Sequence, residues 1–253
     1  MPELSIITIN RNNADGLKKT IESVVYQTYT DFEYIVIDGN STDNSVDVIK
    51  AYAFNINYWV SEPDLGIYNA MNKGLRKAMG EYCLFLNSGD YLVDSNVLST
   101  VFENNFNEDL IYGDQLIEQN QSLVKRTFLI PEYITFRSFM SSTLPHQCTF
   151  IRRSLFLVVG LYNENNKIVS DWEFNVLALF KYNCSLRKID IAISVYDTNG
   201  ISSSMDYMEI HNHEKRQLLY KYFPRFMKDY DAMVRLEKSK TFKLAKTLRK
   251  LFK

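Results

Sequence analysis

The stretch Tyr82-Cys83-Leu84-Phe85-Leu86-Asn87-Ser88-Gly89-Asp90 is a short apolar run that ends in small polar residues and one carboxylate. A run of this length, bounded by turn formers, favours a buried strand of a parallel sheet over a helix. Ligands of open α/β sheets bind just outside the carboxyl ends of such strands. If the chain supplies parallel strands alternating with helices, we expect Asp90 to face a crevice at that edge.

The residues before this stretch alternate between strand and helix patterns. Strands are predicted over residues 4–9, 32–38, 56–60 and 82–87, and helices from residue 15, over 46–53 and over 68–78. This alternation implies right-handed crossovers and a doubly wound, mostly parallel sheet. The sequence therefore predicts an α/β fold with a nucleotide-binding type of layout.

The pattern changes after Asp90. Short strands are expected over 110–114, 122–127, 147–151 and 189–195, and helices over 97–106, over 171–181 and from about 207 to the end, with one break at Pro224. We expect a small antiparallel addition and C-terminal helices. Residues 1–205 would form one domain, with halves at 1–95 and 96–205, and residues 206–253 a helical extension.

Composition narrows the class of protein. The chain has 253 residues, is 46% hydrophobic and carries a net charge of −1, which argues against a nucleic-acid-binding surface. The three cysteines are widely spaced and fit reduced thiols better than a metal site. Neither a signal peptide nor a run of roughly 20 apolar residues is present, so a cytoplasmic protein is expected.

The turn after the first strand excludes one common class. Asn10-Arg11-Asn12-Asn13 stands where a dinucleotide-binding protein has a glycine-rich turn that opens a helix. A nicotinamide-dependent dehydrogenase is therefore not expected. The same four residues fit a nucleotidyltransferase poorly, because that class would have a glycine-rich and basic loop here.

Carboxylates follow three of the predicted strands. Asp38 and Asp90 end their strands, and Glu62 and Asp64 lie in the loop after a third. Asp38 could simply cap the turn at Gly39. Acidic groups repel a phosphorylated ligand unless a divalent cation bridges them, so Mn²⁺ or Mg²⁺ is the expected cofactor.

At this point the chain resembles the inverting glycosyltransferases of family 2, which have the nucleotide-sugar-binding GT-A fold. The matching motifs are Ser5–Arg11, Ile37–Asp43, Glu62–Gly74, Gly80, Leu86–Asp90, His146-Gln147 and Ser170–Glu173, in the same order and spacing from Leu4 to about Asn199. Members with the Gly-Ile-Tyr and Ala-Met-Asn-Lys-Gly pattern are similar to bacterial enzymes that build surface polysaccharide or O-antigen repeats.

The resemblance implies a role for each matched residue. Thr8 and Asn10 would lie beside the nucleotide, and Asp38 would bind its base, typically uracil. Asp90 would be the metal-binding carboxylate of the D-x-D motif, and Asp171 the general base. The matched motifs also place three further residues at the donor, namely Asp64, Asn72 and Asn87.

The chain departs from the family pattern at two motifs. Gly89-Asp90 stands where many relatives have two acidic residues, and Asn87 where many have aspartate, so one carboxylate remains. Met71 stands where relatives often have arginine, which removes one possible contact to the nucleotide.

Two acceptor-side motifs leave alternatives open. Asp171 and Glu173 are two apart on a helix and so point about 200° away from one another, which prevents both from facing one site. Asp171 could instead be an acid favoured by the helix dipole. His146 could contact the metal or the acceptor, or it could be a hydrogen-bonded core histidine.

The C-terminal stretch carries a separate signal. Seven basic residues accompany an apolar stripe in residues 238–253: Lys238, Lys240, Lys243, Lys246, Arg249, Lys250 and Lys253. Such a helix is typical of binding to an anionic membrane surface, although a packed terminal helix with a solvated lysine face has the same pattern. A lipid-linked acceptor would favour the membrane.

We therefore expect a metal-dependent inverting transferase that is peripheral on the inner membrane face. It would move a hexosyl or N-acetylhexosaminyl group from a nucleoside diphosphate sugar, with UDP as the expected carrier, to a saccharide or lipid-linked saccharide. The alternative is a protein of the same fold that binds nucleotide-sugar without turnover.

Overall fold

The computed structural model describes residues 1–119, 122–126, 128, 131–140, 142–198 and 208–239. The chain divides into two compact units, Met1–Met208 and Glu209–Lys253, and each is described by itself.

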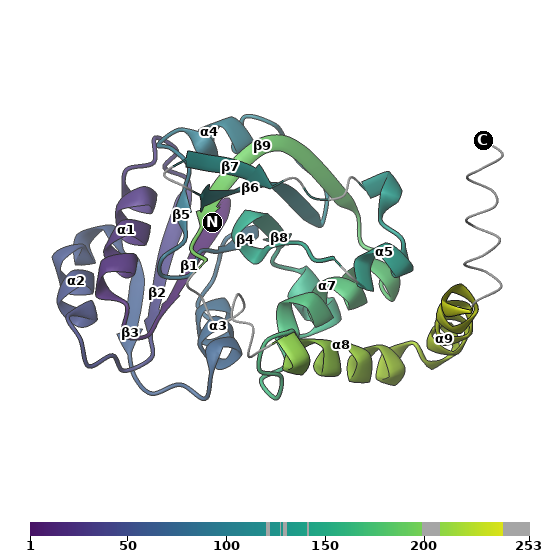
Figure 1. The fold of residues 1–253 in the computed structure, drawn as a ribbon. Helices are drawn as coiled ribbons and strands as arrows, with labels where there is room; N and C mark the ends of the chain where they lie inside the picture. The colour runs from purple at the N-terminus through teal and green to yellow at the C-terminus, as the bar shows by residue number, and fades with distance from the viewer. Residues whose placement is uncertain (120–121, 127, 129–130, 141, 199–207, 240–253) are drawn as a thin grey trace. The chain divides into compact units, whose positions relative to one another are not determined.

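The first unit is built on one mixed sheet whose strand order is β3-β2-β1-β4-β8-β6-β9-β5, with β7 paired to β6 (Figure 1). Its parallel half consists of β1 (Leu4–Asn10), β2 (Phe32–Asp38), β3 (Tyr58–Ser61) and β4 (Tyr82–Phe85). The other half consists of β5 (Tyr91–Leu92), β6 (Leu110–Gln119), β7 (Ser122–Arg126), β8 (Thr149–Arg152) and β9 (Leu186–Tyr196). In this half β6 and β9 are parallel, and the other pairings are antiparallel.

Helices cover both faces of the parallel half. α1 (Ala14–Val25) and α2 (Ser45–Ala51) share one hydrophobic core with strand residues such as Ile6 and Val36. α3 (Ile67–Leu75) lies on the other face, where Gly74 has no side chain and packs directly against Ile7. Because successive strand residues face opposite sides of a sheet, Ile6 packs on the α1 and α2 side and Ile7 packs on the α3 side. The predicted doubly wound α/β arrangement is confirmed.

The remaining helices of this unit lie in its second half. They are α4 (Val97–Phe102), α5 (Phe136–Met140), α6 (Leu155–Val159) and α7 (Ser170–Phe180). Short 3₁₀ turns of the whole unit lie at Ala53–Asn55, Pro131–Tyr133 and His146–Cys148. The last of these turns replaces the start of the strand expected over 147–151, which begins only at Thr149. Short α5 and α6 carry too few turns to show helical periodicity, so the sequence did not predict them.

The C-terminal unit contains α8 (Met208–Tyr222) and α9 (Pro224–Lys238). Pro224 opens α9 at a position where a helix needs no N–H donor, which explains the predicted break. The two helices are joined by the Arg216 guanidinium, which donates to both oxygens of Asp231 at 2.9 and 3.1 Å. Most of the predicted basic helix, from Lys240 onward, lies outside the described residues. Within the described part of the chain, no helix is both long and apolar enough to span a bilayer.

Candidate functional site

Asp38 is fully buried at the carboxyl end of β2, in register with Asn10 of β1 and Ser61 of β3. Its carboxylate accepts hydrogen bonds from the Asn10 amide (2.7 Å), from the Ser41 and Ser61 hydroxyls (2.6 Å each) and from the Ser41 backbone N–H (2.9 Å). Burial by itself raises the pKa of Asp38, but these bonds hold it below its ordinary value. The ionised group therefore fixes the loop after β2 through four hydrogen bonds from three residues.

Asp64 reaches the same corner from the loop after β3. A Cβ on Gly39 would collide with the Asp64 carboxylate, so Gly39 is what permits this approach. The other carboxylate oxygen, Oδ1, accepts the backbone N–H of Gly66 at 3.0 Å and shapes the turn into α3. The Arg11 side chain lies beside the same point, 3.5 Å from the position of that Cβ. Loops after three parallel strands therefore meet at Gly39.

Thr8 and Asn72, which were also assigned to the donor, are buried like Asp38. Thr8 is 0% exposed, and its hydroxyl donates to the Leu86 carbonyl at 2.7 Å. Asn72 is 1% exposed, and its amide donates to the Tyr162 carbonyl and to Glu164 at 2.8 Å each while its oxygen accepts the Tyr162 N–H. Both side chains are therefore buried and hydrogen-bonded within the chain, and their contact with the donor stays a prediction.

The turn that follows β4 is held by α1. The Thr20 hydroxyl donates to the Asp90 carbonyl at 2.7 Å and accepts the Gly89 N–H at 3.0 Å, while the Asn13 amide donates to the Ser88 carbonyl at 3.1 Å. These bonds fix the direction in which the side chains of Asn87 and Asp90 leave the sheet edge. The sequence placed the turn correctly, but these contacts arise only on folding.

Asp90 is 4% exposed, and its Oδ1 accepts the backbone N–H of Asp197 at 2.9 Å. Burial raises the pKa of the Asp90 carboxyl to about 7. The charge of His146 and the N–H of Asp197 act in the opposite direction, whereas the charge of Asp197 adds to the increase. Asp90 is therefore buried among charged groups at the predicted strand end.

Asp171 lies in the first turn of α7 and is held from two sides. The Tyr68 hydroxyl on α3 donates to Oδ1 at 3.1 Å, and Nδ1 of His146 lies 3.4 Å from Oδ2. Nε2 of His146 lies 3.1 Å from the amide nitrogen of Asn87. When the imidazole is neutral and its proton is on Nδ1, it donates to Asp171 and accepts from Asn87. One chain of polar contacts thus runs from the end of β4 to α3.

The pKa values of Asp171 and His146 depend on one another. Burial raises the pKa of Asp171, but the hydrogen bond and charge of His146, with the Trp172 N–H and Tyr68, hold it below its ordinary value. Burial lowers the pKa of His146, but Asp171 and Asp90 together raise it. An ionised carboxylate at Asp171 is the consequence.

The Glu173 side chain points away from the polar contacts of Asp171, because residues two apart on a helix face nearly opposite directions. Its Oε2 accepts from the Asn163 amide at 3.2 Å and from the Asn166 amide at 2.6 Å. Glu173 therefore shapes the loop before α7. The same loop is held by Glu164, which accepts from Asn69 and Asn72 of α3 at 2.8 Å each.

The oxygen atoms at the turn after β4 suit a divalent cation. No group of three or more His, Cys, Asp or Glu side chains gathers as a metal site in the described residues. Mg²⁺ and Mn²⁺ do not require one, since one or two carboxylates, ligand phosphates and waters complete their shell. Oδ1 of Asn87 is buried without a hydrogen-bond partner in the described chain. With Asp90 three residues on, these hard oxygen donors fit the expected ion.

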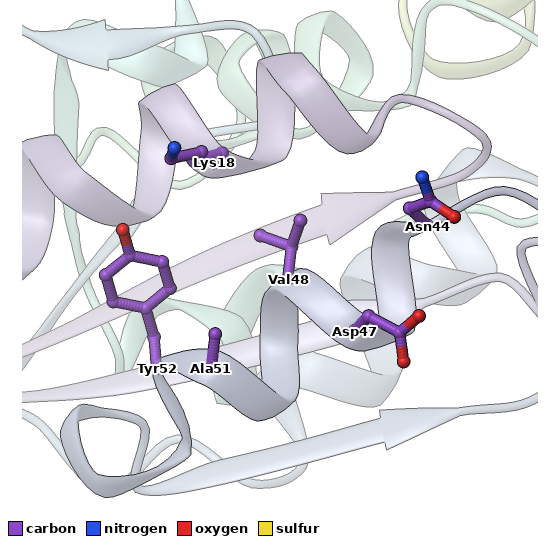
Figure 2. A pocket seen from close by; sticks show the side chains of 6 residues that line it. All are labelled: Lys18, Asn44, Asp47, Val48, Ala51 and Tyr52. Atoms are coloured by element: carbon purple, nitrogen blue, oxygen red, sulfur yellow. The ribbon is translucent and has the colours of Figure 1, made fainter.

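A separate hollow of about 660 Å³ lies between α1 and α2 (Figure 2). Its lining consists of Lys18, Asn44, Asp47, Val48, Ala51 and Tyr52. None of these six belongs to the polar groups described above, and the hollow is open rather than enclosed. It is a groove between two surface helices and does not form part of the candidate site.

The site also contains residues that the sequence did not single out, namely Ser41, Ser61, Tyr68, Glu164 and Asp197. Ser41 and Tyr68 lie inside the matched motifs, so their position there was an available signal. Asp197 belongs to no motif, and it reaches Asp90 from 107 residues away along the chain. Only the pairing of β5 with β9 brings it there.

The mixed sheet, parallel in its first half, has the architecture of the GT-A fold, which similar solved structures share. The profile of the family described as glycosyl transferase family 2 matches residues 5–157. A PGL/p-HBAD biosynthesis glycosyltransferase of Mycobacterium bovis is 30% identical over 205 residues, covering 79% of this chain and 78% of the relative. The chain belongs to glycosyl transferase family 2 and is a glycosyltransferase.

Solved structures share the fold. A structure of TarS of S. aureus is matched over 88% of this chain at a TM-score of 0.64 and 20% identity, and the chain spans 43% of that structure's chain. TarS 1–349 in complex with UDP-GlcNAc has a TM-score of 0.66 at 19% identity, covering 87% of this chain and 71% of that one. Glucosyl-3-phosphoglycerate synthase of Mycobacterium tuberculosis, in complex with Mn²⁺, UDP and glucosyl-3-phosphoglycerate, has a TM-score of 0.60 at 14% identity, covering 87% and 79%.

Proposed function

We propose that this glycosyltransferase is an inverting enzyme that uses a UDP-linked hexose or N-acetylhexosamine. The acceptor is a saccharide or lipid-linked saccharide in the synthesis of a bacterial surface polysaccharide of the O-antigen type. Support comes from the family, from neighbours that bind UDP-GlcNAc or UDP with Mn²⁺, and from the site at the strand ends.

The main support for this proposal is that both carboxylate oxygens of Asp171 have a polar contact. Tyr68 holds one carboxylate oxygen and His146 holds the other, so the carboxylate is fixed in direction and stays ionised. A general base must be ionised and oriented before the acceptor hydroxyl arrives. Tyr68 comes from α3, next to the loop that carries Asp64, so the base is tied to the donor side.

The proposed step is a single displacement. Asp171, with His146 hydrogen-bonded behind it, takes the proton of the acceptor hydroxyl as that oxygen attacks the anomeric carbon of the sugar. The bond from this carbon to the diphosphate breaks, and the electron pair leaves with the diphosphate. One displacement inverts the anomeric centre and needs one base, without a covalent nucleophile.

Asp90 and the side-chain oxygen of Asn87 are the residues that would hold Mn²⁺ or Mg²⁺. A bound divalent ion supplies neutralisation of the charge that develops on the departing diphosphate. Asp38 keeps the loop after β2 in place, and Asp64 with Arg11 closes the same corner of the site.

A stereochemical assay tests the proposal. The full chain is incubated with UDP-linked sugars, Mn²⁺ and a panel of saccharide acceptors, and the anomeric configuration of the product is read by proton NMR. We expect the configuration opposite to that of the donor. A product of retained configuration contradicts the single displacement. Donor binding without transfer or hydrolysis in any combination supports the alternative of a binding protein without turnover.

The location of the enzyme is part of the same proposal. Residues 238–253 combine seven basic residues with an apolar stripe. This pattern favours reversible attachment to the anionic inner face of a membrane, where a lipid-linked acceptor would lie. Support comes from the sequence alone, because residues 240–253 lie outside the described structure.

A further inference from the structure

The turn after β4 lacks a side chain where the family motif commonly carries an acid. Gly89 has a φ of +104°, a backbone conformation that residues with a side chain rarely adopt. An acidic residue at this position would strain the backbone. A second carboxylate for the cation would therefore have to come from elsewhere in the fold.

Asp197 lies at the position that such a side chain would take. A Cβ built on Gly89 would be 2.5 Å from Oδ2 of Asp197 and 3.2 Å from its Cγ. The pairing of β5 with β9 explains this, because Tyr91 faces Val195 and Leu92 faces Ser194 in antiparallel register. Continued by two residues, the same register sets Gly89 opposite Asp197.

A backbone bond fixes the two acidic residues to one another. The N–H of Asp197 donates to Oδ1 of Asp90 at 2.9 Å, so both carboxylates lie at the same turn. Asp90 is 4% exposed, and its Oδ2 accepts no hydrogen bond from the described chain. Oδ1 of Asn87, which belongs to the same turn, is buried without a hydrogen-bond partner in the described residues. Oδ2 of Asp90 and Oδ1 of Asn87 therefore have no hydrogen-bond donor in the described residues, and a cation could take that place.

We propose that Asp197 supplies the second carboxylate of the divalent-cation site, in the space left open by Gly89. The inference rests on the proposed donor site and adds to it a ligand from β9. Mg²⁺ and Mn²⁺ take one or two carboxylates together with ligand phosphates, so Asp197 would add a second carboxylate to the oxygens of Asp90 and Asn87. The two-carboxylate motif is then divided between a turn and a distant strand end.

Metal binding to the full chain tests this assignment without reference to activity. Free Mn²⁺ is measured by electron paramagnetic resonance during titration of wild type, Asp197→Asn and Asp90→Asn, with and without UDP. Asp197→Asn preserves size and the backbone N–H. We expect at least a tenfold loss of Mn²⁺ affinity in both variants and an unchanged affinity for UDP in EDTA. A matched control, Asp190→Asn, removes an exposed carboxylate from the same strand and should match wild type.

A second variant separates direct ligation from a distant charge effect. Asp197→Cys offers a thiolate, which prefers Cd²⁺ to Mn²⁺. Direct ligation predicts at least a tenfold shift of preference toward Cd²⁺ relative to wild type, whereas equal losses for both ions would overturn the assignment. Mn²⁺ affinity of Asp197→Asn within twofold of wild type would also overturn it, as would a wild-type chain that binds no Mn²⁺.

The same titrations keep this inference apart from the proposed function. If UDP and UDP-sugars bind but Asp197 has no effect on Mn²⁺, only the ligand assignment fails. If Mn²⁺ binds through Asp90 and Asp197 but no nucleoside diphosphate sugar binds, the proposed donor fails and the ligand assignment stands.

Discussion

Nδ1 of His146 lies 3.4 Å from Oδ2 of Asp171, which joins a 3₁₀ turn after residue 145 to the first turn of α7. The sequence could assign neither residue a partner. In the fold each residue changes the pKa of the other. The predicted base, Asp171, is therefore coupled to a histidine and is not an isolated carboxylate. The expected effects of substitutions at this pair differ in ways that can be measured.

Asp171→Asn keeps the shape of the side chain but cannot take a proton from the acceptor. We expect kcat to fall by roughly 10² to 10⁴, with the dissociation constant of the donor nearly unchanged. Steady-state kinetics and donor titration measure the two effects. Glu173→Gln on the same helix is the matched control and should alter stability rather than the chemical step. An equal collapse of donor binding in Asp171→Asn would make Asp171 a structural residue.

Tyr68→Phe removes the hydroxyl that donates to Asp171 at 3.1 Å. Because this bond helps to lower the pKa of Asp171, its loss should raise that pKa and move the acidic limb of the kcat/KM profile to higher pH. We also expect kcat to fall by about tenfold, the effect of losing one hydrogen bond to a charged group. An unmoved acidic limb would show that Tyr68 does not act through Asp171.

His146 should stabilise the fold in a pH-dependent way. Its folded pKa is raised above the ordinary value of 6.5, so its contribution is fully present below pH 6.5 and is lost as the pH rises through the folded pKa. The difference in unfolding free energy between wild type and His146→Gln should therefore be larger at pH 6 than at pH 9. Urea unfolding at the two pH values measures it, and an equal difference would contradict the pairing.

Asp38→Asn tests the hydrogen-bonded carboxylate at the end of β2. The variant keeps the size of the side chain but replaces an ionised acceptor of four hydrogen bonds, so we expect a loss of about 3 kcal/mol at neutral pH and weaker UDP binding. Since the folded pKa of Asp38 is lowered from 3.8, this stability is present above that pH and is lost as the pH falls through the folded value. Asp64→Asn, which alters a partly exposed carboxylate nearby, should cost little stability. UDP affinity unaffected by Asp38→Asn would restrict Asp38 to a structural role.

Removal of residues 240–253 tests attachment to membranes. Each basic residue near an anionic surface contributes about 1 kcal/mol, so the truncated chain should leave anionic vesicles while its activity on soluble acceptors survives. Sedimentation with vesicles at low and high salt measures this. Equal sedimentation of both chains, or unfolding of the shorter one, would favour a packed terminal helix.

Local patterns were enough to predict the α/β class and the parallel half of the sheet. Alternating apolar runs and helical spacing are short-range properties, so Ile6, Leu17 and Val36 indicated their elements without knowledge of the rest of the chain. The ends of these strands also placed Asp38 and Asp90 at one edge, because parallel strands end on the same side. The second half was less predictable, since short α5 and α6 leave no periodicity.

Tertiary structure alone decided which predicted residues are buried supports and which polar groups meet. The sequence marked Thr8 and Asn72 as donor residues, and only the fold shows that both side chains are buried and hydrogen-bonded within the chain. Tyr68 reaches Asp171 across 103 residues, and Asp197 reaches Asp90 across 107. No local pattern encodes such distances, because strand register and helix packing arise from the burial of the whole core, and these contacts follow from them.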